Sequence, residues 1–307
     1  MTLSTEDAAD RARDGVLAAF VAYTLWGFLP IYFKVVAAVP SLEVLAHRIV
    51  WAVPFGAPII LARRQWPDVM RAVATRRTLG LLAIAAVVIA VNWLVYIWAV
   101  QNDRIFQASL GYYINPLMYV LVGVALFHER LRRLQTAAVL LAAAGVAVLT
   151  ISGGEFPAVA LTLATCFTIY GVIRSRVAVG GMPGLFIETV ILFPAAAAYL
   201  AWLMYHGDAA FGSGGAAVSG LLVLAGPITV LPLLAFALAA RRLQLSTIGV
   251  MQFIAPTLQF VVGLAYGERL TTAHSVCFAM IWVAVTLFSL DAWRSARTKE
   301  AVLATSS

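Results

Sequence analysis

Ten long runs of apolar residues alternate with short polar segments along the chain. The runs cover residues 16–37, 42–62, 79–100, 107–127, 134–152, 157–174, 184–204, 220–240, 246–266 and 272–292. Each run is close to the roughly 20 apolar residues that a helix needs to cross a bilayer. The strands of outer-membrane barrels are instead about ten residues long and alternate in polarity. The pattern therefore predicts an all-α integral membrane protein with ten transmembrane helices.

The second half of this pattern repeats the first half at an offset of 138 to 140 residues. Apolar helices match one another easily at Ala and Leu, so the repeat rests on rarer residues. The informative matches are Tyr32 with Tyr170, Pro54 with Pro194, Pro116 with Pro256, and Glu129-Arg130-Leu131 with Glu268-Arg269-Leu270. Each copy holds five runs, an odd number, which predicts that the second copy is inverted in the membrane. The expected organisation is a cytoplasmic tail (1–15), a five-helix repeat (16–153), an inverted five-helix repeat (154–292) and a second cytoplasmic tail (293–307).

Basic residues orient these helices in the membrane. If the N-terminus is inside, 17 of the 21 Lys and Arg residues lie on the inner face, whereas Arg104 and Arg269 lie outside and Lys34 and Arg48 lie in or at the edge of spans. Short cytoplasmic loops carry the Lys and Arg excess, so both termini are expected in the cytoplasm. The same asymmetry accounts for the net charge of +7 without a nucleic-acid partner.

An inverted repeat is typical of secondary transporters, which bind their substrate near the membrane midplane between the two repeats. Broken helices commonly form such sites. The candidate helix breakers are Gly27 and Pro30 in the first span and the matched pair Pro116 and Pro256 in spans four and nine. The alternative for any single proline is a simple kink whose freed carbonyl is satisfied by a neighbour.

Several strings of residues together resemble a known family over nearly the whole chain. They are Leu25 to Phe28 with Pro30, His47-Arg48, Asn92-Trp93 with Tyr96, Ser109 to Leu117, Glu188-Thr189, and Gly249 to Pro256. In these strings the chain resembles the RarD branch of the EamA group, within the drug/metabolite transporter superfamily. The resemblance implies ten helices, both termini in the cytoplasm, a bacterial inner (plasma) membrane location and export. The family label also refers to chloramphenicol sensitivity, which no residue of this sequence indicates.

Two charged residues inside spans are the strongest candidates for a solute pathway. Arg48 and Glu188 occupy equivalent places in the repeats, each six residues before a matched proline. A charge at the centre of a span costs about 2.5–3.5 kcal/mol on insertion scales, so it marks a cavity or a partner. Inversion sets the two residues roughly 10–15 Å apart along the membrane normal, which disfavours a direct ion pair. We expect Arg48 in the outer half and Glu188 in the inner half of one polar pathway; the alternative is snorkelling toward the nearer interface.

Polar and aromatic residues within the spans predict the lining of that pathway. The candidates are Trp26, Tyr32, Asn92, Trp93, Tyr96, Tyr112, Tyr113, Asn115, Tyr170, Gln252 and Gln259. Such a lining suits a small amphipathic organic solute better than a bare ion. For the Asn and Gln residues, interhelical hydrogen bonding is the competing account.

His47 titrates near neutral pH in water and, with Glu188, is a candidate for proton coupling. An ordinary interfacial histidine is the alternative. Lys34 is expected to snorkel at the outer end of the first span, and Glu43 is expected to begin the second. A shared outer rim is open to the two residues, and we expect no role in transport for either. Glu129 and Glu268, each followed by Arg, are expected to form short ionic locks beside helix ends rather than gates.

These features predict an exporter of small amphipathic metabolites or drugs that works by alternating access, either gradient-driven or facilitative. The alternative is a multipass receptor or scaffold without transport. The sequence has no phosphate-binding loop, no His-Glu-x-x-His motif and no Cys/His cluster, so we expect no enzyme, catalytic residue, metal or cofactor. Cys166 and Cys277 are expected to be small apolar packing residues. The expected partners are the lipid bilayer and a small organic solute, and the sequence leaves a homodimer open.

Overall fold

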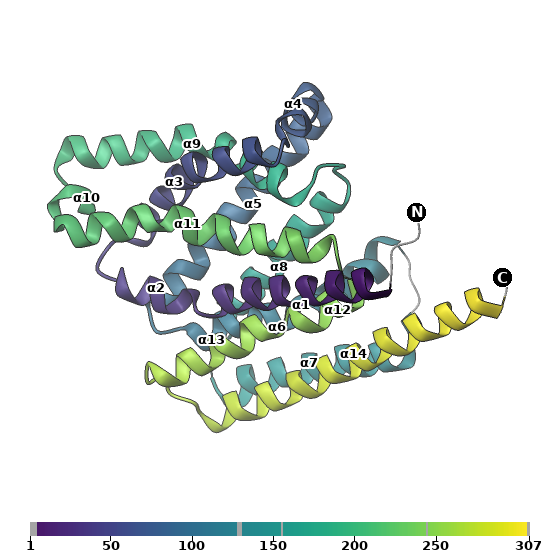
Figure 1. Ribbon diagram of the computed structural model, residues 1–307. Coiled ribbons are helices and arrows are strands. Elements are labelled where there is room, and N and C mark those ends of the chain that lie inside the picture. The colour runs from purple at the N-terminus through teal and green to yellow at the C-terminus, as the bar shows by residue number, and fades with distance from the viewer. Residues whose placement is uncertain (1–4, 128–130, 155, 244, 306–307) are drawn as a thin grey trace.

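A computed structural model describes residues 5–127, 131–154, 156–243 and 245–305 (Figure 1). Within these ranges, residues 5–12, 126–127, 245–246 and 292–305 are described by their backbone alone. The described residues form helices and no strand. The helices are α1 (Thr5–Gly27), α2 (Leu29–Val35), α3 (Ser41–Ala62), α4 (Trp66–Ala74), α5 (Arg76–Gln101), α6 (Ile105–Phe127), α7 (Arg133–Ser152), α8 (Ala158–Ser175), α9 (Gly181–His206), α10 (Ala210–Ser213), α11 (Gly215–Ala240), α12 (Leu245–Met251), α13 (Ile254–Ala265) and α14 (Thr272–Thr305).

Ten helical segments of the described residues are long and apolar enough to cross a membrane, which confirms the predicted number. They are Arg13–Val35, Ser41–Ala62, Arg76–Gln101, Ile105–Ala125, Arg133–Ser152, Ala158–Ser175, Gly181–Ser213, Gly215–Ala240, Thr247–Ala265 and Thr272–Asp291. The largest difference from the sequence-based boundaries is in the seventh segment, which extends from the expected residue 204 to Ser213. The extension arises because the short helix α10 follows α9 after a turn of three residues.

The first span is broken where the sequence predicted, because α1 ends at Gly27 and α2 begins at Leu29 with Pro30 in its first turn. Pro30 has no backbone N–H, so the carbonyl of Trp26, four residues earlier, lacks its helical donor. The side-chain Nε2 of Gln259 on α13 donates to this carbonyl at 3.2 Å. A residue of the second predicted repeat therefore stabilises the break in the first.

The two matched prolines behave differently. Pro256 lies in the first turn of α13, after the break that separates α12 from α13. The first turn of a helix does not need the backbone N–H that proline lacks. Pro116 instead lies in the middle of α6, which continues through it to Phe127. The candidate breaker Pro116 thus sits within a continuous helix, and only its counterpart Pro256 coincides with an interruption.

The helices pack in pairs that relate the two predicted repeats. Helices α3 and α9, α6 and α13, and α7 and α14 contact each other, and each pair joins a span to its own counterpart in the other repeat. The contact between α1 and α11 joins spans one and eight, and the contact between α5 and α8 joins spans three and six. Exchanging the repeats converts one of these two contacts into the other. A pseudo-two-fold axis would produce this pattern.

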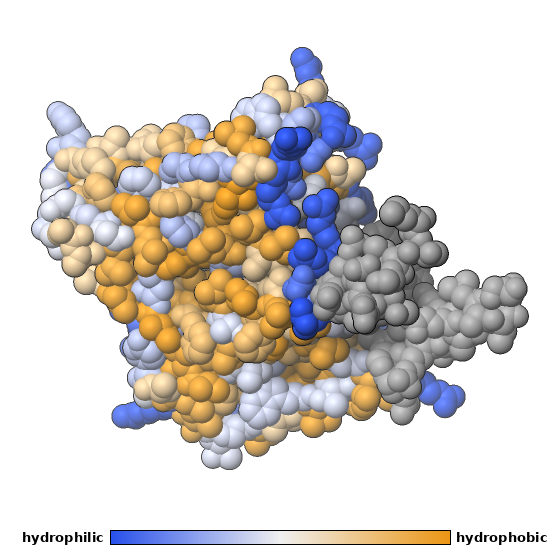
Figure 2. Space-filling model, viewed as in Figure 1, coloured by the Kyte–Doolittle hydropathy of each residue, from blue (hydrophilic) through white to orange (hydrophobic). Residues whose placement is uncertain are grey.

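Polar segments gather at the two ends of the bundle. We call the end that holds residues 63–77, 131–133, 174–180 and 241–243 the basic end, because most of the described arginines outside the spans lie there. The opposite end holds residues 36–40, 102–104, 207–214 and 266–271. Both termini, α4 and α12 lie on the right of Figure 1, and α2 and α10 lie on the left. Figure 2 shows an apolar flank between the ends, with hydrophilic residues gathered on the side of α4 and the termini.

Candidate functional site

Arg48 lies in α3 among aromatic side chains from several helices, and only 6% of its surface is exposed. Its Nε donates a hydrogen bond to Oγ1 of Thr229 on α11 at 2.8 Å. Its guanidinium carbon lies 4.1 Å from the ring centroid of Trp93 on α5, in a cation–π contact. Three tyrosines from α2, α5 and α6 lie close enough to influence its charge: Tyr32, Tyr96 and Tyr112. The site therefore draws on both predicted repeats.

The three tyrosine hydroxyls differ in their hydrogen bonds. The hydroxyl of Tyr32 donates to the carbonyl of Leu221 at 2.9 Å, and that of Tyr112 donates to Oδ1 of Asn92 at 3.4 Å. Tyr96 is 2% exposed, yet its hydroxyl has no hydrogen-bond partner among the described residues. Buried polar groups are normally satisfied, so this hydroxyl calls for an explanation.

Arg48 also lacks an acidic neighbour. Among the residues whose side chains the structure describes, no carboxylate oxygen lies within 4.0 Å of its nitrogens. A buried charge is normally paired, because removal from water is costly. Arg48 is thus a buried cation whose described partners are all neutral.

Glu188 on α9 is the second buried charge, with 1% of its surface exposed. Its Oε1 lies 3.6 Å from Nε of Arg174, and its Oε2 accepts a hydrogen bond from the hydroxyl of Tyr170 at 3.1 Å. Tyr170 and Arg174 both lie on α8, one helical turn apart, and therefore share a face. Nη2 of Arg174 also donates to the carbonyls of Val179 and Gly180, at 3.2 and 3.1 Å. Glu188 is therefore held by an ion pair within its own repeat.

Gly184 makes room for this ion pair. It lies one turn before Glu188 on α9, and a Cβ at this position would come within 2.2 Å of Nη1 of Arg174. Any larger residue would therefore displace the guanidinium that faces Glu188.

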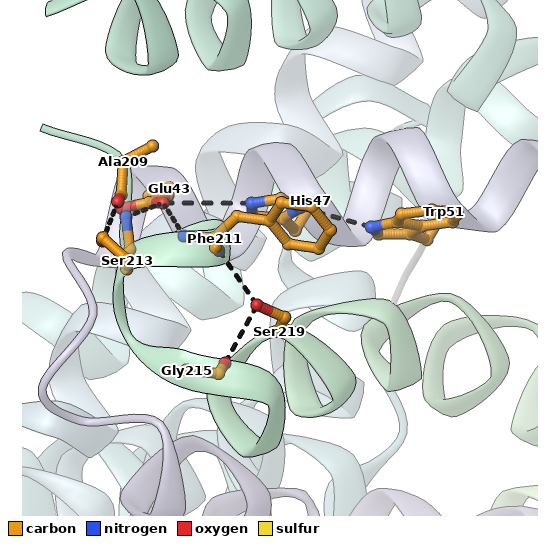
Figure 3. Close-up of polar contacts among 10 residues, drawn as sticks. Glu43, His47, Trp51, Ala209, Phe211, Ser213, Gly215 and Ser219 are labelled. Atoms are coloured by element: carbon orange, nitrogen blue, oxygen red, sulfur yellow. Dashed lines mark hydrogen bonds and ion pairs between the residues drawn. The ribbon is translucent and has the colours of Figure 1, made fainter. Parts of the chain in front are cut away.

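A third polar group runs along one face of α3 (Figure 3). Nε1 of Trp51 donates to Nδ1 of His47 at 3.2 Å, and Nε2 of His47 lies 3.9 Å from Oε1 of Glu43. Because Nδ1 accepts a hydrogen bond, the proton of neutral His47 is on Nε2 and faces the carboxylate. The same Oε1 accepts from the backbone N–H groups of Ala210 and Phe211, at 2.7 and 3.4 Å. Glu43 is fully buried at 0% exposure, and Lys34 pairs with Asp103 and not with Glu43.

Several other candidate residues form hydrogen bonds between helices. Nδ2 of Asn92 donates to the carbonyl of Leu163 at 3.0 Å, and Oδ1 of Asn115 accepts from Thr168 at 3.0 Å. The hydroxyl of Tyr113 lies 2.7 Å from Oγ1 of Thr257. These contacts, with that of Gln259, agree with the assembly role that sequence left open. The side chain of Gln252 instead bonds to the carbonyl of Gly249 in its own segment, and the ring of Trp26 lies against Tyr23 and Phe236.

Glu268, at the opposite end of the bundle, caps a helix rather than forming an ionic lock with Arg269. Both of its carboxylate oxygens lie 3.1 Å from the backbone nitrogen of Phe106, which donates to them. Phe106 is the second residue of α6, where backbone N–H groups lack helical acceptors. Burial raises the pKa of Glu268 from 4.5 to about 7. A cavity of about 450 Å³ lies beside it, lined in part by Asp103, Arg104 and His274. The counterpart Glu129 lies outside the described residues.

Sequence reasoning did not single out Thr229 or Arg174. A threonine in an apolar span carries no signal, because its hydroxyl usually bonds to its own helix, and Thr229 also does so through the carbonyl of Ala225. Arg174 was counted among the loop arginines. Its spacing of four residues from Tyr170 was the available signal. Among the described side chains, no three His, Cys, Asp or Glu residues come together as a metal site.

Comparison with known proteins identifies the family. Residues 13–151 match the model of the EamA-like transporter family. A Vibrio cholerae protein named "Uncharacterized transporter" is 45% identical over 94% of this chain and 95% of its own length. "Protein RarD" of Salmonella typhi is 42% identical over 95% of this chain and 99% of its own length. A solved structure described as "Crystal structure of protein" covers 90% of this chain and 97% of its own, with a TM-score of 0.59 and 20% identity, and supports the fold alone. The nearly full-length identity shows that this multi-pass membrane protein belongs to the RarD branch of the EamA-like transporter family.

Proposed function

We propose that this chain is a secondary transporter of the bacterial inner membrane that exports small amphipathic organic solutes by alternating access. The observation that carries the proposal is the pair of buried charged side chains Arg48 and Glu188, on helices α3 and α9, which pack against each other. A charge inside a transmembrane bundle is expensive and marks a solute or ion pathway by default. Transport is driven by a solute or ion gradient, or is facilitative.

The contacts of Arg48 support a mechanism in which one repeat moves against the other. Trp93 belongs to the first predicted repeat and Thr229 to the second, and both contact the guanidinium. Rocking of the repeats changes the distance between these two partners. The ion pair of Glu188 lies within the second repeat and moves with it as a unit. The contacts of Arg48 therefore change when the repeats move relative to each other, whereas the ion pair of Glu188 does not change.

Transport is tested with a mixture of chemically different solutes. Liposomes that contain the purified protein are loaded with amino acids, small carboxylic acids, amines, sugars and amphenicols, and the retained solutes are measured by mass spectrometry. We expect protein-dependent loss of amphipathic solutes and retention of the sugars. Release identical to that from protein-free liposomes would contradict transport and leave a receptor or scaffold role. Uptake of the released solutes into inverted membrane vesicles, whose cytoplasmic face is outside, checks the direction of export.

The proposed orientation, with both termini in the cytoplasm, is tested by cysteine labelling. Cys166 and Cys277 are replaced by Ala, and a cysteine is then placed at Thr75 at the basic end or at Asp208 at the opposite end, both of which are exposed. We expect an impermeant maleimide to label Asp208→Cys in intact cells and Thr75→Cys only after the inner membrane is opened. The reverse pattern would invert the topology.

A further inference from the structure

We propose that Arg48 and Tyr96 bind the carboxylate of the transported solute, and that this solute is a small monocarboxylic acid with an apolar or aromatic body. The inference rests on the proposed transport function and names its substrate class. It is carried by three features of the described structure: an unpaired buried cation, the orientation of its free donors, and an unsatisfied buried hydroxyl beside it.

The first feature is the charge of Arg48. The guanidinium is buried, and no described carboxylate lies within ion-pair distance. An isolated cation inside a transmembrane bundle raises the free energy of the empty protein. A bound carboxylate neutralises this charge. Binding therefore removes the unfavourable free energy of the unpaired Arg48, and this gain adds to the affinity for an anion. Glu188 cannot play this role, because it is already paired with Arg174 at 3.6 Å.

The second feature is the arrangement of the guanidinium donors. One face of the group is covered by the ring of Trp93 at 4.1 Å, and Nε is engaged by Thr229 at 2.8 Å. No hydrogen bond joins Nη1 or Nη2 to any residue that the structure describes. Two parallel N–H groups on the edge of a guanidinium match the two oxygens of a carboxylate. The ring and the threonine hold the group in place and leave this edge for a ligand.

The third feature is the hydroxyl of Tyr96. It is buried, has no hydrogen-bond partner in the described structure, and lies close enough to Arg48 to influence its charge. A carboxylate accepts several hydrogen bonds, so one bound carboxylate offers acceptors to both this hydroxyl and the guanidinium. An unmade buried hydrogen bond is costly, and its formation on binding therefore adds to the affinity.

The surroundings favour a monoanion with an apolar body. A single guanidinium balances one negative charge, whereas a phosphate dianion would remain charged in the bundle. The ring centroids of Tyr96 and Tyr112 lie 5.7 Å apart, and those of Tyr112 and Phe167 lie 6.0 Å apart, both edge to face. Tyr96, Tyr112 and Phe167 thus form a run of edge-to-face aromatic contacts, which we call the aromatic wall. An aliphatic or aromatic body of the solute would pack against this wall.

The test compares acids with their neutral amides. Thermal stability and binding of the detergent-purified protein are measured with 3-phenylpropionate and 3-phenylpropionamide, and with indole-3-acetate and indole-3-acetamide. Within each pair the two compounds have nearly the same shape and differ in charge. We expect the acids to raise the melting temperature by mass action and the amides to have little effect. Equal stabilisation by acid and amide would overturn the inference, as would the absence of binding by both members of each pair.

Variants locate the binding site. We expect Arg48→Gln to weaken acid binding by about ten- to a hundredfold, which corresponds to the loss of hydrogen bonds to a charged group. Arg48→Lys keeps the charge without the planar fork and is expected to be intermediate. The matched control is Arg104→Gln, since Arg104 also stacks on a tryptophan, Trp98, at 5.2 Å but is exposed at the opposite end of the bundle. Unchanged acid binding in Arg48→Gln would overturn the inference.

Tyr96→Phe separates ligand binding from folding. The hydroxyl has no partner in the described structure, so its removal breaks no internal hydrogen bond and is expected to leave the unliganded melting temperature unchanged. Acid binding is expected to fall severalfold, and the amides are expected to respond little. This variant decides the question if Arg48→Gln does not fold. If the liposome assay shows release of neutral or cationic solutes alone, the carboxylate site is wrong while transport stands.

Discussion

Arg48 and Glu188 occupy equivalent positions in the two predicted repeats, but their surroundings differ in kind. Each lies six residues before a matched proline and is almost fully buried. Glu188 has an arginine partner on the preceding helix of its own repeat, whereas the contacts of Arg48 are neutral and come from both repeats. The two predicted repeats thus share the place of a buried charge but not its compensation.

This difference separates two uses of a buried charge. A paired charge has its counter-charge in the unliganded protein and fixes the local structure, as Arg174 does by facing Glu188 and by joining α8 to the segment before α9. An unpaired charge leaves part of its interaction energy for a ligand. The comparison predicts that Arg48 substitutions weaken ligand binding without loss of stability, whereas breaking the Glu188 ion pair lowers stability. Transport is expected to require both sites.

The largest expected effect is the loss of transport in Glu188→Gln. The substitution removes the negative charge that faces Arg174 and Tyr170, while the amide keeps the shape of the side chain. We expect solute release from liposomes to be abolished while the protein is still produced and inserted. The matched control is Asp208→Asn, which removes a carboxylate from an exposed position. Normal release by Glu188→Gln would remove Glu188 from the pathway and restrict it to a structural role.

The next effect is a difference in stability between variants of the two sites. Arg174→Gln leaves Glu188 buried without its counter-charge, which is expected to cost about 3 kcal/mol of unfolding free energy. Arg48→Gln removes a cation that has no described counter-charge. It is expected to leave stability unchanged or raise it, because relief of the unpaired buried charge offsets the lost hydrogen bond to Thr229. Denaturant unfolding in mixed micelles measures both. The double variant Arg174→Gln with Glu188→Gln is expected to recover much of the loss. Equal destabilisation by the two single variants would break the distinction between paired and unpaired charges.

The sequence predicted the features of the fold that depend on composition and spacing. Ten spans follow from the lengths of the apolar runs, and Gly27 with Pro30 marked the break in the first span because both residues disfavour a continuous helix. The sequence did not predict which side chain compensates a buried charge, because this depends on helix rotation. Arg174 pairs with Glu188 on the next helix, across a short loop. Thr229 contacts Arg48 although the two residues are 181 positions apart in the sequence. The partners of Glu43 could not be predicted for the same reason, because the N–H groups of Ala210 and Phe211 come from a distant turn.

A smaller effect distinguishes the neutral partners of the two charges. Tyr170→Phe and Thr229→Val each remove one hydroxyl that contacts a buried charge. Each is expected to cost about 1.5 kcal/mol of unfolding free energy, as hydrogen bonds to charged groups do. We expect Thr229→Val to lower the rate of release more than Tyr170→Phe, because Thr229 joins Arg48 across the two repeats. If the two variants change release equally, the cross-repeat contact has no special role in the transport cycle.

The smallest expected effect is at Glu268, a half-buried carboxylate outside the spans whose compensation differs from that of both Arg48 and Glu188. Its oxygens accept the backbone N–H of Phe106 at the start of α6 instead of facing an arginine. Burial raises its pKa from 4.5 to about 7, against weaker opposing effects that include this backbone hydrogen bond and the charge of Lys34.

The folded protein therefore binds this proton more tightly than the unfolded chain does. The stability contributed by protonation of Glu268 is fully present below pH 4.5 and is lost as the pH rises through about 7. Glu268→Gln cannot titrate, so the difference in melting temperature between the wild type and this variant is expected to shrink or change sign between pH 4.5 and about 7. The control Asp208→Asn is expected to show the same change of melting temperature with pH as the wild type. If the melting temperatures of the wild type and Glu268→Gln change in parallel with pH, the backbone N–H of Phe106 compensates this carboxylate as fully as an arginine does. Helix N-termini would then count, with arginines, among the effective partners of a buried carboxylate.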